Sequence, residues 1–119
     1  MYAITSDGKK KMSYQEAIEA AGVKVLAFES FGSYQGDWFA KVDGGYVWGT
    51  YGSCTGCDAF EAEFGWGDPT IEALAEFGKG YTDDIWSAEK IVKVFTEQMS
   101  WDLDARSIVE WINKQEGVR

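Results

Sequence analysis

The sequence of 119 residues contains no histidine, a single proline and only two cysteines. Without histidine, the chain cannot form the Ser–His or Cys–His pairs used in nucleophilic catalysis. No stretch approaches the 18 consecutive apolar residues of a membrane-spanning helix, so we expect no membrane span. No apolar block follows the lysines near the N-terminus, which argues against a signal peptide and predicts a cytoplasmic location.

Basic residues are also scarce, and the resulting net charge of −9 is unevenly distributed. The window 54–89 contains nine acidic residues and one basic residue, whereas the remainder contains eleven acidic and ten basic residues. A field of this sign repels nucleic acids and anionic lipids and attracts basic surfaces. We therefore expect a basic protein partner, and no direct binding to nucleic acid or to a membrane.

The chain is rich in apolar side chains, with 45% hydrophobic and 16% aromatic residues. This composition is typical of a globular protein, and the length is sufficient for a hydrophobic core without metal or disulfide crosslinks. The sequence contains no repeats and no segment with the composition of a linker. The sequence therefore predicts one domain over residues 1–119.

Strand patterns between residues 23 and 52 predict a three-stranded antiparallel meander. The first strand, Val23–Phe31, is apolar on both faces, which suggests a central position or helices on both sides. The loop Gly32–Asp37 leads to a second strand at 38–43. Asp43, Gly44 and Gly45 then supply a tight turn before the third strand, Tyr46–Tyr51.

Helical patterns flank these strands and predict an α+β fold, in which an N-terminal helix and three C-terminal helices pack around the meander. The N-terminal helix is Ser13–Gly22, with a capping box formed by Ser13 and Glu16. A short helical segment at 58–64 precedes the C-terminal helices. These are predicted to start at Asp68, near Thr82 and near Asp102, with Gly78–Gly80 ending the first and Gly117 the last.

The apolar residues of the three C-terminal helices recur at helical spacing, and we expect them to face the core. They are Ile71, Leu74 and Ala75; then Ile85, Ala88, Ile91, Val92, Phe95 and Met99; then Leu103, Ala105, Ile108, Val109 and Ile112. Two carboxylate pairs, Asp83/Asp84 and Asp102/Asp104, fall at predicted helix starts. Capping explains both pairs without a catalytic role.

The motif Cys54-Thr55-Gly56-Cys57 is the part of the chain best suited to metal binding or redox chemistry. Buried packing within a Gly/Ser-rich turn is the simplest interpretation. A zinc site needs more ligands than two thiolates, so it would recruit Asp58 or pair two motifs across a homodimer. Redox catalysis is disfavoured because Asp58 and Glu61 raise the thiol pKa. A reversible disulfide remains a further alternative.

Acidic side chains in the charged window are the candidate partner-binding residues, together with aromatic residues beside turns. The acidic candidates are Glu61, Glu63, Glu72, Glu76, Asp83 and Asp84, and the aromatic candidates are Tyr34, Tyr51 and Trp66. Exposed aromatics surrounded by acids are typical of protein-binding surfaces.

The run of residues 33–62 resembles a family of small bacterial and phage proteins with no assigned activity. The matching residues are Tyr34, Gln35, Gly36 and Asp37, followed by Tyr51, Gly52, Ser53, Cys54, Gly56, Cys57 and Asp58. Thr50 departs from the pattern, because that family has glycine there. The resemblance implies a shared hairpin-and-turn scaffold. Small size, acidity and phage association also resemble small anti-defence proteins.

Two functional hypotheses follow. The first is a non-enzymatic, acidic protein of phage or bacterial origin that binds a basic protein surface, such as the nucleic-acid groove of a host or defence enzyme. Its carboxylates would then stand in for the phosphates of DNA, which makes an anti-defence (anti-CRISPR) inhibitor one form of the hypothesis. The alternative is a thiol or zinc site at Cys54, Cys57 and Asp58, without any other cofactor.

Overall fold

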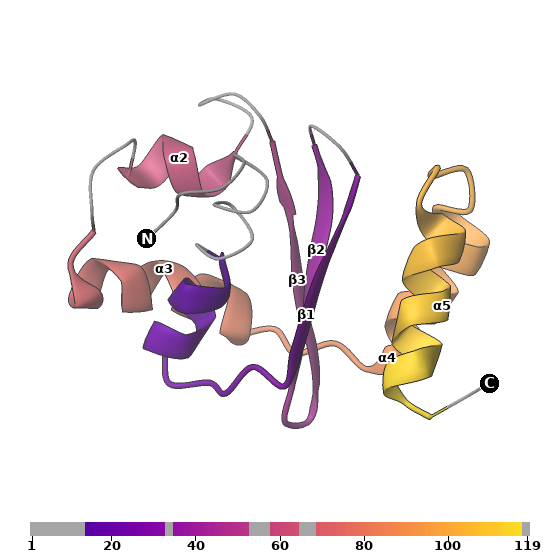
Figure 1. Ribbon diagram of the computed structural model, residues 1–119, viewed down its shortest axis with the longest axis horizontal. Helices are drawn as coiled ribbons and strands as arrows, with labels where there is room; N and C mark the ends of the chain where they lie inside the picture. The colour runs from indigo at the N-terminus through magenta and orange to yellow at the C-terminus, as the bar shows by residue number, and fades with distance from the viewer. Residues whose placement is uncertain (1–13, 33–34, 53–57, 65–68, 118–119) are drawn as a thin grey trace.

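The computed structural model describes residues 14–32, 35–52, 58–64 and 69–117, which form a central sheet with helices on both sides (Figure 1). A helix over residues 14–20 is followed by β1 (Ala27–Gly32), β2 (Gly36–Val42) and β3 (Gly45–Tyr51). The helical segments α2 (Ala59–Phe64), α3 (Ile71–Thr82), α4 (Ala88–Lys93), η1 (Val94–Gln98) and α5 (Ala105–Gln115) complete the order. The predicted α+β fold with an antiparallel meander is therefore confirmed.

The sheet has the strand order β1-β2-β3, and both pairings are antiparallel. The tight turn predicted at Asp43, Gly44 and Gly45 is present: Val42 pairs with Gly45, so the turn itself consists of Asp43 and Gly44, with Gly44 at a φ of 92°. The first strand was predicted to begin at Val23 but begins at Ala27, so residues 23–26 lie outside it. A central position for this strand was wrong: β1 lies at one edge of the described sheet, while helices cover both faces.

Alternation along the strands divides the core into two hydrophobic clusters, one on each face of the sheet. Trp38, Ala40 and Val42 of β2 belong to the first cluster, which also includes Tyr14 and Ile18 of the N-terminal helix. Phe39 belongs to the second cluster, together with residues of α4, η1 and α5. We call these two sides the N-terminal face and the C-terminal face.

On the N-terminal face, α3 packs closely against the helix at 14–20. The contact depends on Gly78, because a Cβ atom there would lie 1.9 Å from the carbonyl oxygen of Ala17. Gly78 and Gly80 were expected to end this helix, and that expectation was wrong: α3 continues through both glycines to Thr82. The close approach of two backbones, which the sequence pattern does not reveal, explains the glycine at position 78.

The start of α3 also differs from the prediction. Thr70, not Asp68, occupies the N-cap position, and its side chain accepts a hydrogen bond from the Ala73 amide at 3.1 Å. Because the helix starts later, Ile71 lies in its first turn and is 69% exposed instead of buried. Phe77 and Tyr81 pack against the first cluster instead.

Residues 83–87 carry the chain past β3 from the N-terminal face to the C-terminal face. Trp86 pairs with Tyr46 through two backbone hydrogen bonds of 2.7 and 2.8 Å, which fix this crossing at the sheet. A helix was predicted to start near Thr82, but α4 starts at Ala88 with Ser87 as its N-cap. Asp83 and Asp84 therefore follow the end of α3 and cap no helix start, and Ile85 is exposed.

The C-terminal face is covered by α4, η1 and α5, whose residues Ile91, Phe95, Ala105, Ile108 and Ile112 are buried as predicted. Five residues of π-helix, η1, carry Phe95 into this cluster. Leu103 was expected in the core but is 99% exposed, because α5 starts only at Ala105 and Leu103 lies in the preceding loop. Within the described part of the chain, no helix is long and apolar enough to cross a membrane.

Candidate functional site

The structure places most of the predicted acidic residues on the solvent side of the N-terminal face. Glu63 of α2, Glu72 and Glu76 of α3, and Asp83 and Asp84 after α3 are all exposed. Glu72 and Glu76 are four residues apart and therefore lie one above the other on the same side of α3. Asp84 also accepts a hydrogen bond from the Trp86 indole nitrogen at 3.2 Å.

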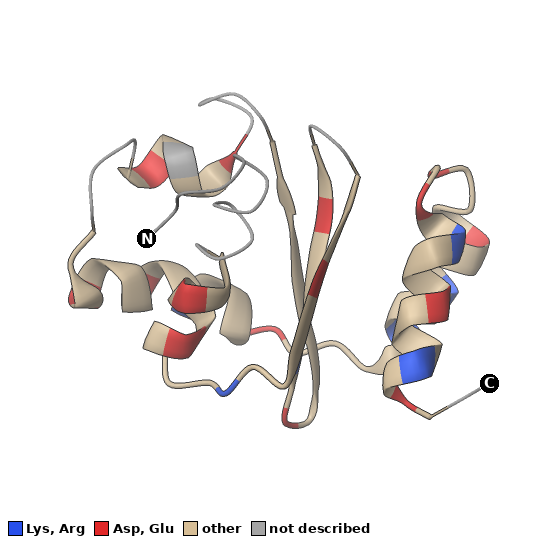
Figure 2. Ribbon diagram, in the orientation of Figure 1, with Lys and Arg blue, Asp and Glu red and all other residues tan. Residues whose placement is uncertain are grey.

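Charge is divided unequally between the two helical layers (Figure 2). The described segments 14–25, 58–64 and 69–85, on the N-terminal face, contain nine acidic residues and only two basic residues, Lys24 and Lys79. Residues 86–117, which cover the C-terminal face, contain six acidic and four basic residues. The N-terminal layer is therefore the strongly negative part of the described molecule.

Several predicted site residues lie outside the described residues: Tyr34, Cys54, Cys57 and Trp66. Glu61 belongs to α2, but its side chain is not described. Tyr51 was expected to be exposed, and that prediction was wrong. Its ring belongs to the first cluster, and its hydroxyl donates a hydrogen bond to the Phe31 carbonyl at 3.1 Å.

Asp58, proposed from the sequence as an accessory metal ligand, is 1% exposed and engaged in a buried hydrogen-bond network. Its Oδ1 atom accepts hydrogen bonds from the Tyr14 hydroxyl at 3.0 Å and from the Gly52 amide at 3.1 Å. The Tyr14 hydroxyl in turn accepts a hydrogen bond from the Phe60 amide at 3.2 Å. Burial and the adjacent Asp58 raise the pKa of Tyr14, so its hydroxyl stays protonated.

This network connects the N-terminal helix, the end of β3 and the start of α2. Its geometry gives Asp58 a structural task, since coordination of a metal through Oδ1 would compete with two donors already in place. Among the described residues, no three Cys, Asp or Glu side chains are close enough together to hold a metal ion.

A second acidic site, on the C-terminal face, was not predicted. Asp37 at the start of β2 faces Asp102 and Asp104 of the loop between η1 and α5, and these residues line a pocket of about 500 Å³ together with Gln35 and Thr50. We call it the aspartate pocket. Burial, with the negative charges of Asp102 and Asp104, raises the pKa of Asp37 to about 6.

The sequence predicted other roles for these three aspartates. Asp37 was placed in a loop, whereas it pairs with Phe31 and Thr50 inside the sheet. Asp104 occupies the N-cap position of α5, but its side chain makes no capping hydrogen bond, so capping alone does not explain it. Asp102 accepts a hydrogen bond from the Asp104 amide at 2.8 Å. Alternation along β2 was the available signal, because it puts Asp37 on the same face as Phe39.

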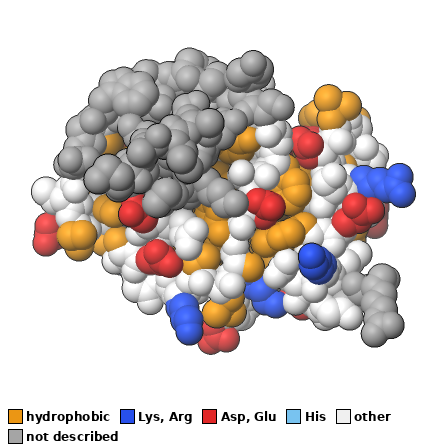
Figure 3. All heavy atoms as spheres, viewed as in Figure 1, with side chains coloured by type: hydrophobic (Ala, Val, Ile, Leu, Met, Phe, Trp, Pro, Cys, Tyr) orange, Lys and Arg blue, Asp and Glu red, His pale blue; other side chains and the backbone are white. Residues whose placement is uncertain are grey.

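Apolar side chains border the aspartate pocket. Trp101 and Leu103 line it and are 74% and 99% exposed. Figure 3 shows a hydrophobic projection beside an acidic side chain at the upper right, over the loop between η1 and α5. Exposed tryptophan and leucine beside the buried Asp37 and the half-buried Asp102 and Asp104 offer both apolar and charged contacts to a ligand.

A larger groove of about 1250 Å³ lies between the β2–β3 turn and α4 and α5. Lys41 Nζ contacts the Gln115 carbonyl at 2.7 Å and Glu116 Oε2 at 3.8 Å, and the Tyr46 hydroxyl donates to Glu116 at 2.6 Å. Lysine and glutamate side chains both line this groove, so its charges largely compensate one another.

No family model, curated protein or solved structure matches the chain. The resemblance to small phage and bacterial proteins therefore stays a prediction.

Proposed function

We propose that this protein is a non-enzymatic binding module that engages the basic surface of a partner protein through its acidic N-terminal face. The supporting observation is the charge of the N-terminal layer, with nine acidic and two basic residues in the described segments 14–25, 58–64 and 69–85. Exposed carboxylates on Glu72, Glu76, Asp83 and Asp84 make this charge accessible to a partner. Complementary fields of this kind accelerate association and select partners by charge.

A phage or bacterial accessory protein that acts in the cytoplasm of a host cell fits this mode of binding. Carboxylates spaced along α3 can occupy a nucleic-acid groove in place of phosphates, so an anti-defence inhibitor is the most specific form of the proposal. The buried engagement of Asp58 gives no support to the alternative thiol or zinc site.

Two charge-reversal variants test the proposal. In the first, Glu72→Lys and Glu76→Lys are combined on α3. In the second, the matched control, Glu89→Lys and Glu97→Lys are combined on the C-terminal face. Each variant changes the net charge by the same amount, and all four side chains are exposed.

The immobilised protein is first used to capture proteins from a bacterial lysate, and each captured candidate is purified. Its Kd is then measured by calorimetry at low and high salt. We expect a partner whose Kd weakens at high salt and weakens about tenfold or more in the α3 variant, with a much smaller change in the control. A partner insensitive to salt and to both variants would contradict the proposal, as would the capture of no protein that binds directly.

A further inference from the structure

The aspartate pocket has the features of a binding site for a charged ligand. Asp37 is buried, with 7% of the residue exposed. No hydrogen bond or ion pair joins its carboxylate to another described residue. A buried carboxylate without a donor is costly, and proteins normally pair such groups. The charge of Asp37 therefore points to a cationic ligand.

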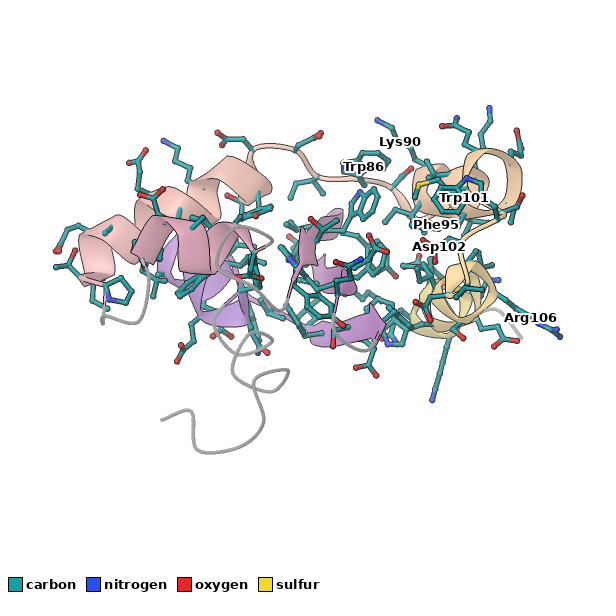
Figure 4. All side chains as sticks on the ribbon, turned by 90° about the horizontal axis from the view of Figure 1, so that it is seen from above. Trp86, Lys90, Phe95, Trp101, Asp102 and Arg106 are labelled. Atoms are coloured by element: carbon teal, nitrogen blue, oxygen red, sulfur yellow. The ribbon has the colours of Figure 1, made fainter. Side chains whose placement is uncertain are left out.

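The surroundings of Asp37 strengthen the argument for a cationic ligand. Asp102 and Asp104 line the same pocket and add two further negative charges, and no basic residue is among the described lining residues. Arg106 follows closely in the chain, but it is largely exposed and pairs with Glu110 at 3.6 Å. Figure 4 shows the Arg106 side chain pointing away from Asp102. The described molecule thus supplies no cation of its own to this site.

The spacing of the carboxylates selects the kind of cation. Among the described residues, no three acidic side chains converge closely enough to hold a metal ion. A guanidinium group is larger and planar and has five N–H donors, so it can bridge acceptors that are too far apart for one metal. The Thr50 hydroxyl and the Gln35 amide, which also line the pocket, offer further polar contacts.

Trp101 and Leu103 at the border of the pocket suit a ligand that continues as a polypeptide. An indole ring stacks on a guanidinium group through cation–π attraction, and Trp and Arg are enriched among residues that dominate protein interfaces. Leu103 protrudes fully into solvent and can contact an apolar residue next to the arginine.

We propose that the aspartate pocket, formed by Asp37, Asp102 and Asp104, binds an arginine side chain of the partner protein. The Trp101 ring covers that side chain, and Leu103 packs on its apolar neighbour. This inference rests on the proposed function, since it assigns one residue of the basic partner to a specific pocket on the C-terminal face. The acidic residues of α3 then supply general attraction, and the pocket supplies specificity.

The test uses the full chain, labelled with ¹⁵N, and the peptide acetyl-Leu-Arg-Leu-amide. A matched peptide with citrulline in place of arginine has nearly the same shape but no charge. We expect the arginine peptide to shift the amide signals of Gly36 and Thr50 and the indole signal of Trp101. The citrulline peptide should bind about ten times more weakly, because it cannot form a charged pair with the aspartates.

Three substitutions that each remove one negative charge locate the binding. Asp37→Asn and Asp102→Asn should each weaken the arginine peptide about tenfold, whereas Asp43→Asn, on an exposed acid beyond the opposite end of β2, should leave its Kd unchanged. Asn retains an acceptor for the Asp104 amide at position 102, so the loop should keep its structure. Unchanged signal dispersion in each variant verifies folding.

Equal binding of both peptides would overturn the inference, as would equal weakening by Asp43→Asn and Asp37→Asn, or shifts that avoid the pocket. Pocket signals that move with protein concentration alone would assign the site to a second copy of this chain and would also overturn it. If the α3 variant still weakens a basic partner while the peptide leaves the pocket unchanged, only the arginine pocket fails. If the peptide binds the pocket but no basic protein partner exists, only the proposed function fails.

Discussion

On the N-terminal face of the sheet, the layers are joined by contacts between residues far apart in the chain: the Tyr14–Asp58 hydrogen bond spans 44 residues, and Gly78 contacts Ala17. On the C-terminal face, α4, η1 and α5 follow one another within residues 88–115 and bury mainly aliphatic and aromatic side chains against Phe39. The polar contact between Tyr46 and Glu116 on that side lies at the perimeter, whereas Asp37 is buried there.

The difference indicates that the two faces respond differently to mutation. An apolar cluster tolerates small changes of shape, since neighbouring side chains repack. A backbone contact without space for a Cβ atom and a buried carboxylate with two specific donors have no equivalent substitute. The N-terminal face also includes the Trp38 indole nitrogen, which is buried and has no hydrogen-bond partner among the described residues. We therefore expect it to be the more sensitive face.

The strongest test of this difference is Gly78→Ala. The new Cβ atom would overlap the Ala17 carbonyl, so α3 and the N-terminal helix must separate, and we expect a loss of about 3 kcal/mol or more in unfolding free energy. Gly80→Ala is the matched control in the same helix, where the added methyl group meets nothing within 4 Å. It should stabilise the protein by about 0.5 to 1 kcal/mol.

Urea denaturation measures both variants. Equal stability of Gly78→Ala and Gly80→Ala would show that the contact with Ala17 imposes no constraint.

A pair of tyrosine substitutions compares the polar contacts of the two faces directly. Tyr14→Phe removes one donor from the buried Asp58 carboxylate and the acceptor of the Phe60 amide, and should cost about 2 kcal/mol or more. Tyr46→Phe removes a hydrogen bond to Glu116, which water can replace at the perimeter, and should cost about 1 kcal/mol or less. Thermal or urea unfolding gives the ranking, and a reversed order would contradict the proposed difference between the faces.

Asp37→Asn tests the C-terminal face, because the buried Asp37 carboxylate is an unfavourable group on that face. The folded-state pKa of Asp37 is raised from 3.8 to about 6, so the folded protein binds a proton more readily than the unfolded chain. The Asp37 charge therefore destabilises the fold above pH 6, and this penalty disappears as the pH falls from 6 towards 4.

We expect Asp37→Asn to increase the unfolding free energy at pH 7 by about 1 to 2 kcal/mol, less than the full linkage value of about 3 kcal/mol because the pocket opens to water. The gain should shrink towards pH 4. Denaturation of wild type and variant at pH 4, 5, 6 and 7 measures it, and a difference independent of pH would contradict the raised pKa of Asp37.

Local patterns were sufficient to predict much of the fold. Alternation placed Trp38 and Phe39 on opposite faces, Asp43 and Gly44 predicted the hairpin turn, and the helical spacing of Ile108 and Ile112 identified a buried stripe. Helix boundaries were predicted less well. The glycines of α3 were interpreted as a stop, because a stop and a close helix contact both favour glycine.

The two candidate sites also differ in how well the sequence predicted them. Exposure of Glu72 and Glu76 was predictable, since acids on the outer side of an amphipathic helix face water. The aspartate pocket was not, because Asp37 and Asp102 are separated by 65 positions in the sequence and no local pattern relates them. Asp102 and Asp104 had a sufficient local explanation as capping residues, which concealed their position opposite Asp37.

The sequence by itself determined the α+β class, the antiparallel meander and the excess of acidic residues in the window 54–89, because each depends on composition or on spacing within a few residues. Only the tertiary structure decided that Gly78 is a contact point, that Asp58 is buried against Tyr14, and that three aspartates face one another. These features depend on residues distant in the chain, and the packing of the two helical layers on the sheet brings them together.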